Sequence, residues 1–168
     1  MNQETFELRK IHRDAVPEAI EKAEHYRLLN DPEQAESICR DVLRADPENQ
    51  RALVVLVLAM TDQFQGNGAS PGTAKAREYA DKLKDEYQKL YYSGIIAERE
   101  GRAFLSRGMS SAFAYDAFRA AMDLYEKAEA VRPPGNDDPI LRWNSCVRTI
   151  RRAGLRPLQE SPRELPLE

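Results

Sequence analysis

Apolar residues recur along most of this chain at the three- and four-residue spacing that is typical of one face of an α-helix. One such stripe covers residues 16–26 and a second covers residues 35–43, and only a short link around Asn30 and Asp31 lies between them. Because so short a link joins antiparallel neighbours, residues 15–46 are predicted to form a helical hairpin.

Three Asp-Pro pairs mark expected helix starts, because aspartate caps a helix and proline fits its first turn. They lie at Asp31, Asp46 and Asp138. The segment 50–64 contains an apolar run over residues 53–60, which also has the β-branched content of a buried strand. Since no other segment could pair with such a strand, we expect a central helix that is covered on both sides.

Residues 65–73 are predicted to be a loop, because glycine, serine and proline dominate there. Their spacing is not G-x4-G-K-[ST], so a phosphate-binding loop is rejected. Residues 73–107 carry two helical stripes. A break near residues 84–88 is predicted between them, and one long helix is the alternative. Two more helices are expected, over residues 110–132 and 138–153.

The pattern predicts an all-α fold of about seven helices. A length of 168 residues suggests one domain. Its expected parts are an N-terminal arm (1–14), three antiparallel hairpins (15–46, 48–85 and 86–133), a last helix (138–153) and a flexible, proline-containing tail (154–168).

The first hairpin carries small and bulky residues at a recognisable repeat spacing: Ala23, Tyr26, Ala35, Cys39, Val42 and Pro47. In the third hairpin, Gly94 takes the first small position, and residues 125–133 are similar to the end of a repeat's second helix. About 15 extra residues separate Gly101 from Ala121, which corresponds to about two extra turns on each of two helices. Gly101 is therefore expected inside a helix. The chain resembles a divergent tetratricopeptide repeat (TPR) protein over residues 15–153.

This resemblance implies a short right-handed α-solenoid whose last helix caps the stack. It also implies a concave groove, lined by the first helix of each hairpin, that binds a peptide. The residues expected to line it are Ile20, Glu24, Arg27, Arg51, Val54, Val55, Leu58, Gln88, Tyr91, Tyr92, Ile95, Glu98, Arg99 and Arg102. In the alternative, Val54, Val55 and Leu58 belong to the core and are covered by the arm or the tail.

The TPR groove that binds chaperone C-termini requires lysine and asparagine side chains at set positions. Here Ile20, Glu24 and Val55 stand at those positions. Recognition of chaperone tails by such a carboxylate clamp is therefore not expected.

Composition narrows the possible classes of protein. Lys and Arg number 25 against 28 Asp and Glu, so the net charge of −3 gives no overall case for binding nucleic acid or an anionic membrane. No apolar run approaches the ~18 residues of a membrane span. The N-terminus lacks an apolar signal core and there are only two cysteines, so we expect a cytoplasmic protein.

One local charge cluster stands out at the C-terminal end of the predicted domain. It comprises Arg142, Arg148, Arg151, Arg152 and Arg156. These arginines could dock RNA, phosphate or an acidic partner. The favoured interpretation is a solvated helix face whose charges offset the helix dipole, because no aromatic residues alternate with them.

No catalytic motif, metal-ligand spacing or cofactor fingerprint is recognisable, so neither an enzyme nor a cofactor is expected. Cys39 is interpreted as a small buried residue, and Glu21, Glu24 and Glu98 as solvated residues on exposed helix faces. The leading hypothesis is a non-catalytic adaptor that holds a protein or peptide segment in its groove. The alternatives are a self-associating structural protein, such as a homodimer, and binding of nucleic acid or an acidic partner through the arginine cluster.

Overall fold

The computed structural model describes residues 5–66 and 72–159, and these residues form α-helices joined by short turns, with no strand among them. After a single 3₁₀ turn at Arg13–Ala15, the described helices are α1 (Val16–Leu28), α2 (Pro32–Ala45), α3 (Gln50–Asp62), α4 (Thr73–Ala80), α5 (Glu86–Ser106), α6 (Ser111–Ala130) and α7 (Asp138–Ala153). Among these, none is long and apolar enough to cross a membrane. The all-α prediction with seven helices is confirmed for the described residues.

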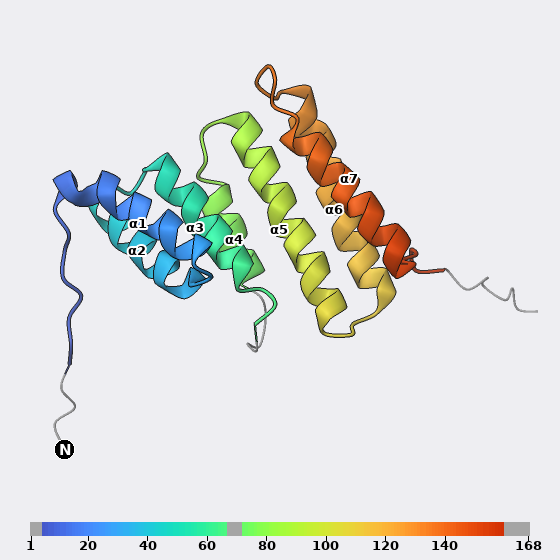
Figure 1. Ribbon diagram of the computed structural model, residues 1–168, viewed down its shortest axis with the longest axis horizontal. Coiled ribbons are helices and arrows are strands. Elements are labelled where there is room, and N and C mark those ends of the chain that lie inside the picture. The colour runs from blue at the N-terminus through green and yellow to red at the C-terminus, as the bar shows by residue number, and fades with distance from the viewer. Residues whose placement is uncertain (1–4, 67–71, 160–168) are drawn as a thin grey trace, which may run out of the picture.

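The helices form two layers. Each helix packs against the next one along the chain, and α3 also packs against α1 and α5. In Figure 1, α1, α3, α5 and α7 follow one another across the front, and α2, α4 and α6 lie behind them. The odd-numbered helices therefore share one face of the molecule.

Two hydrophobic clusters make up the core. The first is built mainly from α1 to α4, and the second from α5 to α7. Tyr92 of α5 packs against both clusters, and Leu58 of α3 packs against the second. Arg107, after α5, donates a hydrogen bond of 3.0 Å to the carbonyl of Phe64, after α3. Contacts between α3 and α5 thus join the two halves.

Local capping explains where several helices begin. The Asp31 carboxylate accepts a hydrogen bond from the backbone N–H of Gln34, as the Asp-Pro pattern predicts for α2. At Asp46 the prediction of a helix start is wrong, because this residue ends α2 and the side chain of Asn49 caps α3 instead. At the third pair, α7 does begin at Asp138.

The chain between Thr73 and Ser106 forms two helices, and the break lies at residues 81–85, slightly before the predicted position. Leu83 in the break is buried. The backbone N–H of Lys84 donates a hydrogen bond of 2.8 Å to Oε1 of Gln50, at the start of α3. A side chain distant in sequence therefore satisfies the interrupted backbone.

Glycines let α5 and α6 approach closely. Gly94 faces the ring of Tyr125, and Gly101 faces the ring of Phe118. Gly101 lies inside α5, which confirms the prediction that the third hairpin is longer than the first. With 21 and 20 residues, α5 and α6 are the longest helices described.

The ends of the domain are more ordered than the sequence indicates. Ile11, in the predicted arm, packs against the first cluster. Gly154 adopts a left-handed conformation (φ 62°) that ends α7, and the following Leu155 is buried in the second cluster. The prediction of a flexible tail from residue 154 is therefore wrong for Leu155, while residues 160–168 lie outside the described part.

We expect the substitution Gly94→Ala to destabilise the fold. A Cβ atom at this position would lie 2.5 Å from Cε1 of Tyr125, whose ring is fully buried. The overpacking should lower the free energy of unfolding by about 1–3 kcal/mol, although alanine favours helix by about 1 kcal/mol over glycine. Urea denaturation measures this, with the neighbouring Ser93→Ala as control. Equal stability of both variants would contradict the close packing.

Alkaline pH should also destabilise the fold through its buried thiols. Burial raises the pKa of Cys39 and of Cys146 from 9.0 to about 12. Because an unfolded thiol loses its proton near pH 9 while the folded one keeps it, the contribution of each thiol to stability is complete below pH 9. It is then lost progressively as the pH rises to 12.

The measurement is urea denaturation from pH 8 to 11 under reducing conditions. Each thiol should lower the free energy of unfolding by about 1.4 kcal/mol per pH unit above pH 9. A Cys39→Ala variant should show a shallower slope, whatever its stability at pH 8. An unchanged slope would exclude Cys39 as a source of the effect.

Candidate functional site

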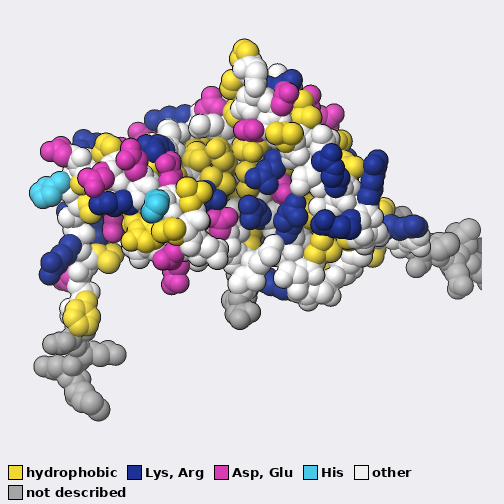
Figure 2. Space-filling view, viewed as in Figure 1, with side chains coloured by type: hydrophobic (Ala, Val, Ile, Leu, Met, Phe, Trp, Pro, Cys, Tyr) yellow, Lys and Arg dark blue, Asp and Glu magenta, His cyan; other side chains and the backbone are white. Residues whose placement is uncertain are grey.

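The most distinctive surface is the face formed by α1, α3, α5 and α7, which we call the odd-helix face. Figure 2 views the molecule from this side. Hydrophobic side chains gather over its middle, Lys and Arg side chains are frequent toward α7, and acidic side chains are frequent toward α1. The residues predicted to line a groove belong to these helices, but they divide into buried and accessible groups.

Three residues predicted to line an accessible groove are core residues. Ile20, Val55 and Ile95 are 3 %, 3 % and 2 % exposed. Their helices carry apolar residues on more than one side, and these positions face the neighbouring helices, so the prediction is wrong for them. Val54 and Leu58 are only partly buried and remain accessible on the face.

Tyrosines from α5 lie on the same face as Val54 and Leu58. The rings of Tyr87 and Tyr91 stack with centroids 5.6 Å apart, and Tyr92 meets the ring of Tyr91 edge-on at 5.2 Å. Burial raises the pKa of Tyr87 to about 12, and the Tyr87 hydroxyl accepts a hydrogen bond of 3.0 Å from Nδ2 of Asn136. The hydrogen bond from Asn136 holds the Tyr87 ring in place. Val54, Leu58, Tyr91 and Tyr92 form what we call the apolar strip.

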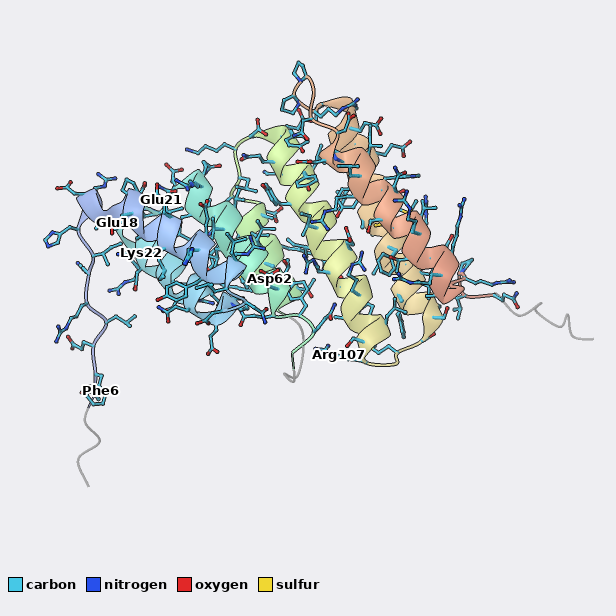
Figure 3. All side chains as sticks on the ribbon, in the orientation of Figure 1. Phe6, Glu18, Glu21, Lys22, Asp62 and Arg107 are labelled. Atoms are coloured by element: carbon cyan, nitrogen blue, oxygen red, sulfur yellow. The ribbon has the colours of Figure 1, made fainter. Side chains whose placement is uncertain are left out.

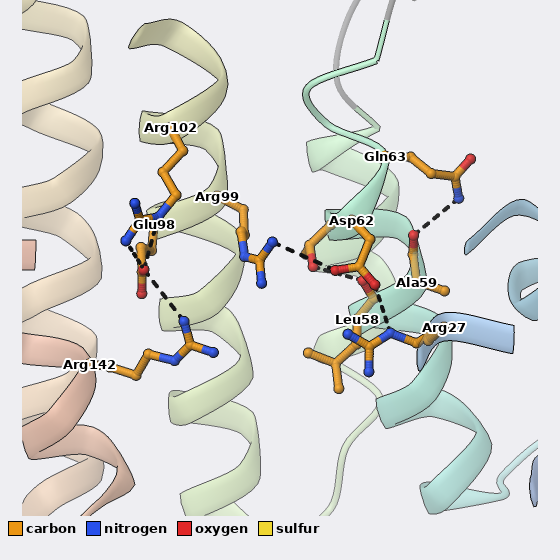
Figure 4. A network of polar contacts seen from close by, with 10 residues as sticks. Arg27, Leu58, Ala59, Asp62, Gln63, Glu98, Arg99, Arg102 and Arg142 are labelled. Carbon is orange, nitrogen blue, oxygen red and sulfur yellow. Dashed lines mark hydrogen bonds and ion pairs between the residues drawn. The ribbon is translucent and has the colours of Figure 1, made fainter. Parts of the chain in front are cut away.

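Beside this strip, Asp62 links the two halves of the molecule. Its Oδ2 atom lies 2.8 Å from Nε of Arg27 on α1, and its Oδ1 atom lies 3.6 Å from a terminal nitrogen of Arg99 on α5 (Figure 4). Asp62 is the last residue of α3, where the helix dipole disfavours a negative charge. The two guanidinium groups offset this cost. Nε of Arg99 is buried and has no hydrogen-bond partner among the described residues.

A second carboxylate, that of Glu98, is fully buried. Its Oε2 atom accepts a hydrogen bond of 2.6 Å from the hydroxyl of Tyr125 on α6. Its Oε1 atom lies 2.8 Å from Arg102 on α5 and 3.5 Å from Arg142 on α7 (Figure 4). Arg102 also donates to Oγ of Ser145. The prediction of Glu98 as a solvated, groove-lining residue is therefore wrong: this side chain joins α5, α6 and α7.

The buried carboxylate of Glu98 shifts the pKa values of its neighbours. Burial, reinforced by the adjacent carboxylate, raises the pKa of Tyr125, so the hydroxyl stays protonated and donates. Burial works against the charge of Arg142, yet Glu98 and Tyr91 outweigh it and the pKa of Arg142 is raised. Both partners therefore keep the protonation state that the network requires.

The remaining predicted groove residues, Glu24, Arg51 and Gln88, are at least partly exposed and make contacts with neighbouring residues. Glu24 of α1 accepts two hydrogen bonds, of 2.9 and 2.6 Å, from Arg51 of α3. Gln88 lies partly buried in the first turn of α5, where its backbone N–H donates to the capping carboxylate of Asp85.

The predicted arginine cluster divides into two groups. Arg142 faces α5, is 32 % exposed and is engaged with Glu98, so it does not share the exposed position of the other arginines. Arg148, Arg151, Arg152 and Arg156 are exposed and form no ion pair within residues 5–66 and 72–159. The exposed arginines extend the positive charge of the odd-helix face along α7.

Sequence reasoning missed a hollow between α2, α3 and α4. Its volume is about 390 Å³. It is lined by the arm residue Leu8, by the apolar Leu43, Pro47 and Leu53, by the ring of Tyr79 and by the cations Arg40, Arg44 and Lys82. These residues come from four separate segments, so no local motif signals the hollow.

The described residues contain no group of three or more histidine, cysteine or acidic side chains arranged to hold a metal ion. His12 and His25 are exposed, and Cys39 and Cys146 are buried, free thiols with raised pKa values. Burial and a high pKa both make a thiol a poor nucleophile. Neither thiol is therefore placed as an accessible nucleophile.

Comparison with known protein families, with curated proteins and with solved structures finds no match to this chain.

We expect Glu98→Gln to destabilise the protein much more than Glu100→Gln on the same helix. The first change leaves Arg102 and Arg142 facing a neutral group in a partly desolvated site, which should cost about 3 kcal/mol or more. The second removes only the partner of Arg77, 53 % of whose side chain is exposed, and should cost about 1 kcal/mol or less.

Urea denaturation of both variants measures the difference. A double-mutant cycle with Tyr125→Phe should give a combined effect smaller than the sum of the two, because Tyr125 and Glu98 share one hydrogen bond. Additive effects, or equal costs for Glu98 and Glu100, would contradict the central role of the buried carboxylate.

Proposed function

We propose that the chain is a TPR-like, right-handed α-solenoid that acts as a non-catalytic adaptor. In this proposal, the three hairpins stack side by side, α7 caps the stack, and the odd-helix face is its concave surface. The alternation of helices between two layers supports this arrangement, as does the close packing of Gly94 against Tyr125. Both features fit a repeat whose small residues let paired helices approach.

The observation that carries the proposed function is the accessible apolar strip. Leu58, Tyr91 and Tyr92 are only partly buried although they pack against the core clusters, and Val54, one turn before Leu58 on α3, is also partly buried. Fixed guanidinium groups border the strip at Asp62 and at Glu98. An apolar centre with a charged border, preorganised by its own ion pairs, is the arrangement that interaction surfaces use.

The ordered side chains of this face favour the binding of a protein segment. Stacked tyrosines and paired arginines have already lost rotamer freedom, so a partner that contacts them loses little further entropy in this protein. A protein segment that places apolar side chains on the strip would bury both surfaces. We therefore assign the odd-helix face as the site that holds a partner protein.

The test is quantitative affinity capture from lysate of the source cells. The bait is the wild-type chain beside a Val54→Asn, Leu58→Asn variant, which removes apolar contact without adding charge. We expect bound partners to be reduced about tenfold or more by this double substitution, equivalent to about 1.4 kcal/mol. Circular dichroism and melting temperature establish that the variant is folded.

Phe113→Asn is the matched control. Phe113 is an exposed apolar residue on α6, outside the odd-helix face, and its ring contacts that of Phe104. Partners retained by both variants would contradict the assignment of the face. A partner set consisting only of further copies of this chain, with dimers seen by light scattering, would show self-association instead.

A further inference from the structure

The odd-helix face has more fixed positive than negative charge. Four guanidinium groups, those of Arg27, Arg99, Arg102 and Arg142, are grouped around only two carboxylates. Each carboxylate neutralises one of the two arginines beside it, which leaves a surplus of about two positive charges. The side chains of these arginines are between 23 % and 32 % exposed, so they are held in place and still reach solvent.

Relying on the proposed function, we propose that the partner segment is acidic, with apolar side chains on the strip and side-chain carboxylates on the arginines beside it. A guanidinium fork binds a carboxylate through two parallel hydrogen bonds, and desolvation strengthens such bonds. Arg99 has a further reason to accept a new partner, since the contact of its terminal nitrogen with Asp62 is long at 3.6 Å and 30 % of its side chain is exposed. The preferred ligand is thus a pair of carboxylates flanking an apolar residue.

The distribution of charge also orients the segment. Glu18 and Glu21 lie on α1, at the opposite end of the molecule from α7, and Lys22 pairs with Glu18 at 2.9 Å (Figure 3). The exposed arginines Arg148 and Arg151 lie at the α7 end. Like charges repel and opposite charges attract over roughly 10 Å at physiological salt, so the acidic part of the partner should lie over α5 and α7.

Two features favour an acidic protein segment over a nucleic acid. The apolar strip occupies the middle of the face, where a phosphate backbone would gain nothing. In addition, Asp62 and Glu98 interrupt the row of guanidinium groups, whereas a nucleic acid presents evenly spaced phosphates that are best met by uninterrupted cations. Separated carboxylates on a flexible protein segment can match the interrupted pattern.

Peptide display provides the test. Random twelve-residue peptides, displayed without a free C-terminal carboxylate, are selected on the biotinylated full-length chain. We expect selected peptides to be enriched in Asp and Glu beside an apolar residue. A representative peptide, synthesised with an amidated C-terminus, should bind about tenfold more weakly when NaCl is raised from 50 to 300 mM.

Two sets of variants locate the binding. Arg99→Gln with Arg142→Gln should weaken the selected peptide about tenfold or more, with folding verified by melting temperature. Arg148→Glu with Arg151→Glu changes only exposed side chains and should weaken it about threefold. Lys127→Gln, on the exposed side of α6, should leave binding unchanged.

The other outcomes separate the two proposals. Selected peptides without acidic enrichment that lose binding in the Val54→Asn, Leu58→Asn variant would overturn the acidic partner and keep the adaptor function. If the binding of every selected peptide is unaffected by the strip substitutions and by the arginine substitutions, both the adaptor function and the acidic partner are overturned. Arginine-dependent binding of a twelve-nucleotide oligo-uridine probe that exceeds binding of any selected peptide would replace the acidic segment with nucleic acid.

Discussion

The second half of this protein depends on one buried carboxylate. Glu98 has no contact with solvent, and a carboxylate in such a place is tolerated only when its lone pairs and charge are met. Tyr125 from α6, Arg102 from α5 itself and Arg142 from α7 meet them together. Because each helix supplies a different partner, a shift of any of the three helices would leave the carboxylate without one of its contacts. The guanidinium groups of Arg102 and Arg142 are placed by the same contacts.

Much of the fold follows from local sequence. The helical stripes, the cap at Asp31 and the position of Gly101 inside a long helix are all readable from residues a few positions apart. The break at residues 81–85 is not readable in this way. It is stabilised by Gln50, whose side chain bonds the backbone on either side of Leu83 from more than 30 positions away. The spacing of apolar residues around the break does not indicate so distant a partner.

The candidate site was less predictable than the fold. A helical stripe shows which residues share a side of a helix but not whether that side meets solvent or another helix, so the pattern alone does not predict that Ile20 and Val55 are buried. Glu98 looks like an ordinary exposed residue because its partners Tyr125 and Arg142 are 27 and 44 positions away. An acidic residue in a stripe that also contains glycine is the one signal that could have identified it, since the glycine implies close approach of another helix.

Tyr125 has two roles at once, and this restricts how the sequence can change. Its ring occupies the space left by the missing side chain of Gly94, and its hydroxyl satisfies Glu98. A smaller residue at 125 would leave an empty volume and would remove the hydrogen bond to the Oε2 atom of Glu98, while a larger residue at 94 would displace the ring that donates this bond. Positions 94, 98 and 125 therefore form one unit of variation. In sequences that diverge from this one, these three residues should be replaced together or kept together.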